Sequence, residues 1–110
     1  MTFKTVSIAT IRQAARRVAL WVHPEKVILF GSHAYGKPTW DSDVDLLLVI
    51  KNGSRKARQT ALLKASAALD PRPFPVDLLV KSRSQIESRI SQGDFFLQDI
   101  MENGRVLYER

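Results

Sequence analysis

The sequence has no cysteine among its 110 residues. A chain without cysteine cannot form a disulfide framework, a zinc ribbon or a thiol nucleophile. It also contains no apolar run near the ~18 residues of a transmembrane helix, and its first residues lack the apolar segment of a signal peptide. These absences predict a cytoplasmic protein that does not enter a membrane.

The remaining composition is that of an ordinary globular domain, with 45% hydrophobic and 25% charged residues. A chain of this length has room for one hydrophobic core, so we expect a single domain over residues 1–110. Its formal net charge is +6, from 17 basic and 11 acidic residues. This excess of positive charge favours polyanionic or acidic partners.

Hydrophobic spacing predicts helices and strands that follow one another without repeats or linkers. The first helix is expected to run from about Ile8 to Val22 and to end at His23-Pro24. Further helices are expected over 55–69, from Ser82 or Ser84 to about 91, and over 95–103; strands are expected over 26–30, 43–50 and 76–80, with a short edge strand over 106–108. The predicted class is α/β (α+β), with a small mixed sheet flanked by helices.

The last predicted helix carries a dense group of large apolar side chains. We expect Phe96, Leu97, Ile100 and Met101 to pack inward from it.

The segment GSHAYGKP, from Gly31 to Pro38, is close to the P-loop template G-x-x-x-x-G-K-[ST]. Proline stands where the template needs a hydroxyl that binds magnesium, and the following residues lead to a turn and a strand instead of a helix. A P-loop is therefore excluded. A strand that runs into Gly31-Ser32 and a helical turn over 33–35 still predicts a phosphate cradle, because glycine permits close backbone approach.

Two carboxylates, Asp43 and Asp45, begin the second strand. Residues two apart on a strand point to the same face, roughly 6.7 Å apart along it. Two such charges repel each other at the mouth of a buried strand, and a divalent cation held by both relieves the repulsion. Asp77 begins the third strand and would complete the group if the two strands pair. The arrangement predicts a metal site suited to phosphoryl or nucleotidyl transfer.

Asp41 extends these acids to the series D-S-D-V-D, which invites comparison with an EF-hand loop. That template needs glycine at its sixth position and glutamate at its twelfth, where this chain has Leu46 and Asn52. The EF-hand is excluded, and Asp41 is interpreted as a turn residue.

The pattern Gly31-Ser32, ten residues, then Asp43-Val44-Asp45, with Asp77 as a third acid, resembles the nucleotidyltransferases of the DNA polymerase beta superfamily. The shortness of the chain resembles the minimal nucleotidyltransferases, which are the antitoxins of HEPN–minimal-nucleotidyltransferase toxin–antitoxin pairs.

The resemblance implies the nucleotidyltransferase fold and transfer of AMP from ATP, with Mg²⁺, to a hydroxyl acceptor. By the same resemblance, Gly31 and Ser32 hold the triphosphate, Asp43 and Asp45 hold the metals, and Asp77 completes the metal site and helps deprotonate the acceptor. In the antitoxin subfamily the acceptor is a tyrosine of the HEPN ribonuclease toxin, which the modification silences. The residues give their own reason to expect a second protein, because metals and a phosphate loop leave little of a 110-residue chain to grip an acceptor.

The chain departs from that family at His33 and Tyr35, where members commonly have arginine, as in GSRARG. A histidine is mostly neutral at pH 7 and compensates phosphate charge less well than arginine. Lys37 is the candidate that replaces this charge.

Two rival functions remain open. One is an antitoxin that only binds its toxin; the other is a small-molecule or nucleic-acid nucleotidyltransferase that forms half of a two-chain enzyme resembling the kanamycin type.

The cations Arg55, Lys56 and Arg58 are interpreted either as a solvated face or as a contact with an acidic partner or with RNA that the partner holds. Nucleic acid is thus expected only indirectly.

Overall fold

A computed structural model of the protein describes residues 5–110. Its elements are α1 (Ile8–Val22), β1 (Lys26–Phe30), α2 (Ser32–Tyr35), β2 (Val44–Ile50), α3 (Arg55–Ala68), β3 (Val76–Ser82), α4 (Arg83–Ser91), α5 (Phe95–Asn103) and β4 (Arg105–Glu109). The strands form one sheet in the order β3-β2-β1-β4. β2 and β3 are parallel, whereas β1 is antiparallel to both β2 and β4. The predicted mixed sheet is confirmed, and the second and third strands pair, which the sequence had left open.

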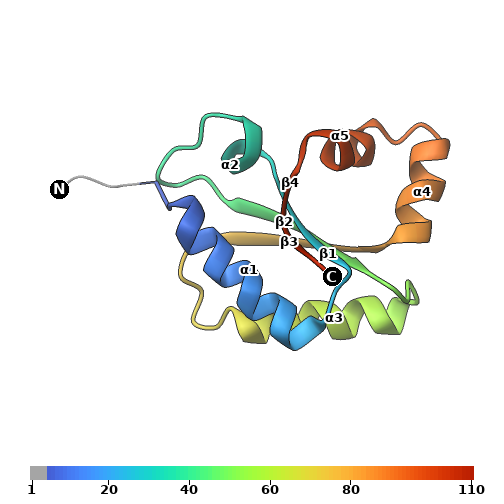
Figure 1. The fold of residues 1–110 in the computed structure, drawn as a ribbon, viewed down its shortest axis with the longest axis horizontal. Helices are drawn as coiled ribbons and strands as arrows, with labels where there is room; N and C mark the ends of the chain where they lie inside the picture. Colours follow the sequence, from blue (N-terminus) through green and yellow to red (C-terminus); the bar gives the residue numbers. More distant parts are fainter. Residues whose placement is uncertain (1–4) are drawn as a thin grey trace.

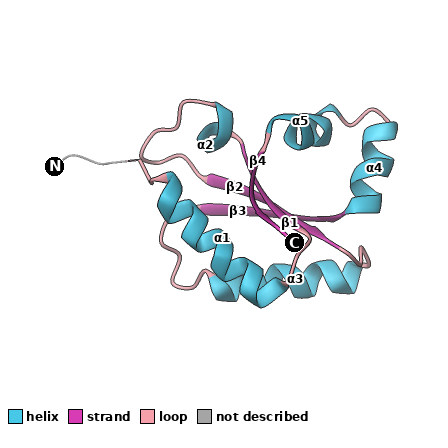
Figure 2. Cartoon of the chain, viewed as in Figure 1, coloured by secondary structure: helices cyan, strands magenta, loops and turns pink. Residues whose placement is uncertain are grey.

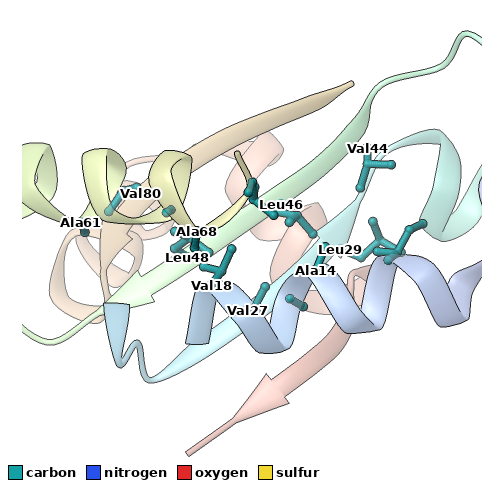
Figure 3. Packing of buried hydrophobic residues seen from close by; sticks show 14 of the residues in the cluster. Ala14, Val18, Val27, Leu29, Val44, Leu46, Leu48, Ala61, Ala68 and Val80 are labelled. Carbon is teal, nitrogen blue, oxygen red and sulfur yellow. The ribbon is translucent and has the colours of Figure 1, made fainter. Parts of the chain in front are cut away.

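Helices cover both faces of this sheet (Figures 1 and 2). α1 and α3 lie on one face, and α4 and α5 lie on the other. The sequence of β2 explains this layering, because alternate side chains of a strand point to opposite faces. Leu46 and Leu48 belong to the core under α1 and α3 (Figure 3), whereas Leu47 and Val49 belong to the core under α4 and α5. Because β2 is buried on both faces, its sequence is a continuous apolar run and does not alternate between apolar and polar residues.

Serine side chains fix where α3 and α4 begin. The Ser54 hydroxyl accepts a hydrogen bond from the Ala57 amide at 3.1 Å, as predicted for this N-cap. Ser82 and Gln85 form a capping box at the start of α4, so Ser82 and not Ser84 is its N-cap. Within residues 5–110, no helix is both long and apolar enough to span a membrane.

The prediction that Phe96 packs inward is wrong. Leu97 and Ile100 are buried and Met101 is half-buried, but the Phe96 side chain is 58% exposed and that of Phe95 is 79% exposed. Successive residues of a helix are about 100° apart around its axis. Phe96 therefore sits at the margin of the buried face of α5, where its ring and that of Phe30 meet edge to face at a centroid distance of 5.7 Å.

Asp94 caps α5 and depends on its charge to do so. Its carboxylate accepts a hydrogen bond from the Leu97 amide at 3.0 Å and pairs with the Arg89 guanidinium at 3.0 Å. The amide bond first, and then Arg89, lower the pKa of Asp94 below its ordinary value. A carboxyl group whose pKa is lowered in the folded chain stabilises the fold at pH values above its ordinary pKa, which is ~4. This stabilisation is lost as the pH falls through the lowered pKa.

We therefore expect Asp94→Asn, which keeps a good N-cap but loses the charge, to lower the thermal unfolding midpoint at pH 7. The difference from the unmodified chain should shrink as the pH falls below about 4. Circular dichroism melts at a series of pH values measure this directly. A difference that stays constant with pH would show that the charge is not its cause.

Candidate active site

The fold brings two of the three predicted acids into direct opposition. Asp45 and Asp77 are register partners on the parallel strands β2 and β3. Neighbouring strands lie about 4.8 Å apart, and partners in register point to the same face. That face is the one under α4 and α5, because Leu47 and Leu79, two residues further along each strand, pack there. Asp43 lies immediately before β2 and is exposed.

The electrostatics of Asp45 show that the charges of all three acids interact. Burial raises the pKa of Asp45, and the nearby charges of Asp77 and then Asp43 raise it further, while His33 acts in the opposite direction. Even so, no group of three or more His, Cys, Asp or Glu side chains within residues 5–110 is arranged to hold a metal ion. The acids therefore form a concentrated negative site without a complete set of metal ligands.

Gly31 is required by the position of the Asp45 carboxylate. It follows Phe30, the register partner of Asp45 on β1, and has φ 76° and ψ −154°, a conformation that is essentially restricted to glycine. A Cβ atom at this position would overlap Oδ2 of Asp45. Gly36 has a related role, since a Cβ there would lie 2.8 Å from Cα of Ser32. At both glycine positions of the GSHAYGKP segment, the structure thus leaves no room for a side chain.

The short helix α2 holds the predicted phosphate-binding residues beside the acids. Ser32 is its first residue, and the first N–H groups of a helix, here those of Ser32 and His33, have no acceptor within it. His33 serves another purpose: Nε2 donates to the carbonyl oxygen of Ser42 at 3.1 Å and so ties α2 to the residue before Asp43. Lys37 is exposed in the loop after α2, and within the described residues it has no ion pair and no contact with the acids.

A cavity of about 420 Å³ opens beside the acids. Its lining consists of Phe30, Gly31, Tyr35, Asp45, Asp77, Leu78, Leu79 and Phe96. The Tyr35 hydroxyl donates to Oδ2 of Asp99 on α5 at 3.1 Å, and this bond links α2 to α5. Neither Tyr35 nor Phe96 was expected to line a cavity. The available signal was the pair Phe95-Phe96 at a helix start, since a narrow buried face cannot cover both rings.

Comparison with protein families shows which family this chain belongs to. The sequence profile described as the nucleotidyltransferase domain matches residues 9–107. The chain belongs to this nucleotidyltransferase family. The match confirms the resemblance seen in the Gly-Ser and D-x-D motifs. A search of curated proteins found no match to this nucleotidyltransferase.

Solved structures share its fold at low sequence identity. One is described as a nucleotidyltransferase from Sulfolobus solfataricus, with a TM-score of 0.62 and 20% identity over 93% of this chain and 83% of that one. A toxin–antitoxin structure with AMP-PNP has a TM-score of 0.56 and 21% identity over 90% and 73%. A mutant of the toxin–antitoxin pair MntA-HpeT has a TM-score of 0.52 and 19% identity over 96% and 75%. The fold of this nucleotidyltransferase therefore also occurs in toxin–antitoxin complexes.

The donor chemistry of the site fits a magnesium ion and a nucleotide. Carboxylate oxygens are the ligands that Mg²⁺ prefers, and burial together with the charges of Asp77 and Asp43 raises the pKa of Asp45, an effect that a bound cation would oppose. The missing side chain of Gly31 leaves the Asp45 carboxylate room at the end of β1.

The same repulsion predicts a stabilising substitution. We expect Asp45→Asn to raise the thermal unfolding midpoint in EDTA, because it removes a partly buried charge that lies between two others. Magnesium should raise the midpoint of the unmodified chain and not that of the variant. Differential scanning fluorimetry with and without Mg²⁺ measures both effects. A variant that is less stable in EDTA and still responds to magnesium would contradict the interpretation.

Proposed function

We propose that this nucleotidyltransferase is an antitoxin that transfers AMP from ATP to a tyrosine hydroxyl of a HEPN-type ribonuclease toxin and thereby neutralises it. The observation that carries the proposal is the opposition of Asp45 and Asp77 beside a glycine that leaves space for the Asp45 carboxylate. The occurrence of the same fold in toxin–antitoxin structures, one of them with AMP-PNP, supports the choice of partner and nucleotide.

In the proposed reaction, Asp43, Asp45 and Asp77 hold Mg²⁺, which when bound neutralises phosphate charge and favours departure of pyrophosphate. The amides of Gly31 and Ser32, with the Ser32 hydroxyl, hold the triphosphate, and Lys37 adds positive charge. The acceptor oxygen forms a bond to the α-phosphorus as the bond to pyrophosphate breaks. Asp77 takes the proton of the acceptor hydroxyl.

The aromatic cavity is the proposed place for the acceptor side chain. Its lining includes Asp45 and Asp77 and also Gly31, so it adjoins both the acids and the proposed phosphate cradle. Phe30, Tyr35 and Phe96 give it aromatic walls, and aromatic rings pack favourably against one another. A tyrosine ring in the cavity would have its hydroxyl directed toward Asp77.

We expect Phe96→Ala to reduce transfer at low toxin concentration by about tenfold, since loss of one aromatic contact costs roughly 0.5–1.5 kcal/mol together with lost apolar burial. Transfer at saturating toxin should be much less affected. Phe95→Ala is the matched control, because Phe95 is the preceding residue and does not line the cavity. Equal losses in the two variants would contradict the assignment of the cavity.

The proposed function is tested by co-expression with the product of the adjacent gene, followed by intact-mass measurement of that product. Whole AMP increments that require ATP and disappear on Asp43→Ala/Asp45→Ala would support adenylylation. An unmodified partner that co-purifies and is neutralised would favour an antitoxin that only binds. Absence of both a mass increment and co-purification would overturn the antitoxin assignment in favour of a small-molecule or nucleic-acid acceptor.

A further inference from the structure

Cations gather at the end of the sheet opposite the acids. Asp45 and Asp77 stand near the starts of the parallel strands β2 and β3, and the seven residues of β2 span about 20 Å to its other end. Around that far end lie α3, which follows β2, and α4, which follows β3 (Figure 1). We call the cations there the basic end: Lys51, Arg55, Lys56, Arg58, Lys64, Lys81 and Arg89.

Two hollows give the basic end its shape. One, of about 460 Å³, has Lys51, Lys56 and Lys64 in its lining, and the other, of about 440 Å³, has Arg58, Lys81 and Arg89. Neither lining contains an aspartate or a glutamate. The remaining polar lining residues are Asn52, Ser54 and Thr60 beside His23 in the first hollow, and Ser84, Gln85 and Ser88 in the second.

The turn between β2 and α3 holds the two hollows together. The Gly53 carbonyl oxygen accepts hydrogen bonds from Arg58 Nε at 3.2 Å and from Gln85 Nε2 at 3.1 Å. These bonds join the start of α3 to α4. The two hollows of the basic end therefore share this turn, which hydrogen bonds tie to both helices.

The charges of the basic end are largely uncompensated inside the chain. Among the ion pairs within residues 5–110, only that of Arg89 with Asp94 involves a member of this group. The first turn of α3 carries Arg55 and Lys56 and no acidic residue, although a helix start disfavours cations. Neither intrachain pairing nor helix stability explains this arrangement, whereas an external polyanion does.

We propose that the basic end binds the sugar–phosphate backbone of double-stranded nucleic acid. Lysine and arginine together with Ser, Thr, Asn and Gln are the side chains that contact phosphate oxygens. Cores of protein interfaces are instead enriched in aromatic residues and depleted in lysine. The exposed aromatic rings Tyr35 and Phe96 lie at the cavity beside the acids. No Phe, Tyr or Trp side chain lines either hollow, which favours a duplex over a single strand.

The test is fluorescence anisotropy of the full chain with a labelled RNA duplex of about 20 base pairs and with a DNA duplex of the same sequence, at salt concentrations from about 50 to 200 mM. The variant Lys51→Gln/Arg55→Gln/Lys56→Gln removes three exposed charges that form no ion pair within residues 5–110. Its control, Arg12→Gln/Arg16→Gln/Arg17→Gln on α1, removes the same net charge elsewhere. Circular dichroism melts confirm that both variants fold.

We expect the logarithm of the observed binding constant to fall linearly with the logarithm of the salt concentration. The variant at the basic end should flatten this slope by about 3 and weaken binding at least about tenfold at low salt, whereas the α1 control should change it little. Preference for one duplex identifies RNA or DNA as the source of the backbone.

Three results would overturn the proposal: no binding to either duplex at low salt, equal losses in the two variants, or tighter binding to single strands than to duplexes. Loss of partner binding in the basic-end variant, with no duplex binding by the unmodified chain, would assign the surface to an acidic protein. Nucleotide transfer is not measured in this experiment, so its outcome is independent of the proposed antitoxin activity.

Discussion

Replacing Asp43 and Asp45 together by asparagine is expected to lower the rate of nucleotide transfer to the partner by at least about a thousandfold. The proposed metal site loses two of its three carboxylates, and a metal ion supplies several kcal/mol of charge stabilisation in such reactions; a thousandfold corresponds to ~4 kcal/mol. Folding should survive, because the substitution removes two of the charges that repel one another around Asp45. Quenched-time mass spectrometry of the partner measures the rate.

Asp41→Asn is the matched control for this loss. Asp41 is two residues before Asp43, and its carboxylate accepts a hydrogen bond from the Thr39 hydroxyl in the turn before β2. Neutralising this single carboxylate outside the acid group should leave transfer within a few-fold of the unmodified rate. If the control loses as much activity as the double variant, the local field and not metal binding explains the effect.

Gly31→Ala is expected to abolish transfer and to destabilise the fold together. The new methyl group would overlap Oδ2 of Asp45, and alanine at φ 76° is strained by roughly 1–3 kcal/mol. The overlap displaces either the Asp45 carboxylate or the end of β1, so the acid group loses its arrangement. Thermal melts measure the destabilisation, and the mass assay measures transfer.

Gly93→Ala separates the effect of backbone strain from the effect of overlap with the Asp45 carboxylate. Gly93 also has a positive φ, 93°, but an added Cβ would meet no atom within 4 Å. This control should show the cost of backbone strain and keep its transfer activity. Full activity in folded Gly31→Ala would mean that the Asp45 carboxylate moves without consequence, and the proposed role of Asp45 would then be wrong.

Local patterns in the sequence were sufficient for most of the secondary structure. Period-3.6 spacing of apolar residues predicted the main helices, short continuous apolar runs predicted the strands, and Ser54 was correctly placed as a helix cap. The motif spacing also predicted the family that the domain match confirms. These signals are local, because each depends on residues within one element or one turn.

The sequence did not predict the environment of α5. Four apolar residues were assigned to the core, yet Phe96 lines the cavity beside the acids. Whether a residue at the margin of an apolar helix face is buried depends on what covers it, and the Phe96 side chain stays 58% exposed. The hydrogen bond from Tyr35 to Asp99 is equally non-local, since 64 residues separate the partners.

The sequence by itself determined that acids, glycines and a helical turn occur in an order typical of nucleotidyl transfer. Only the tertiary structure decided that β2 and β3 pair in parallel with Asp45 opposite Asp77, and that Gly31 lies against the Asp45 carboxylate. The fold alone, likewise, gathered the cations of α3, β3, α4 and the turn after β2 at the far end of the sheet. The reason is that strand order, register and helix docking depend on contacts between residues distant in the chain. The spacing of apolar residues within one helix or strand contains no information about those contacts.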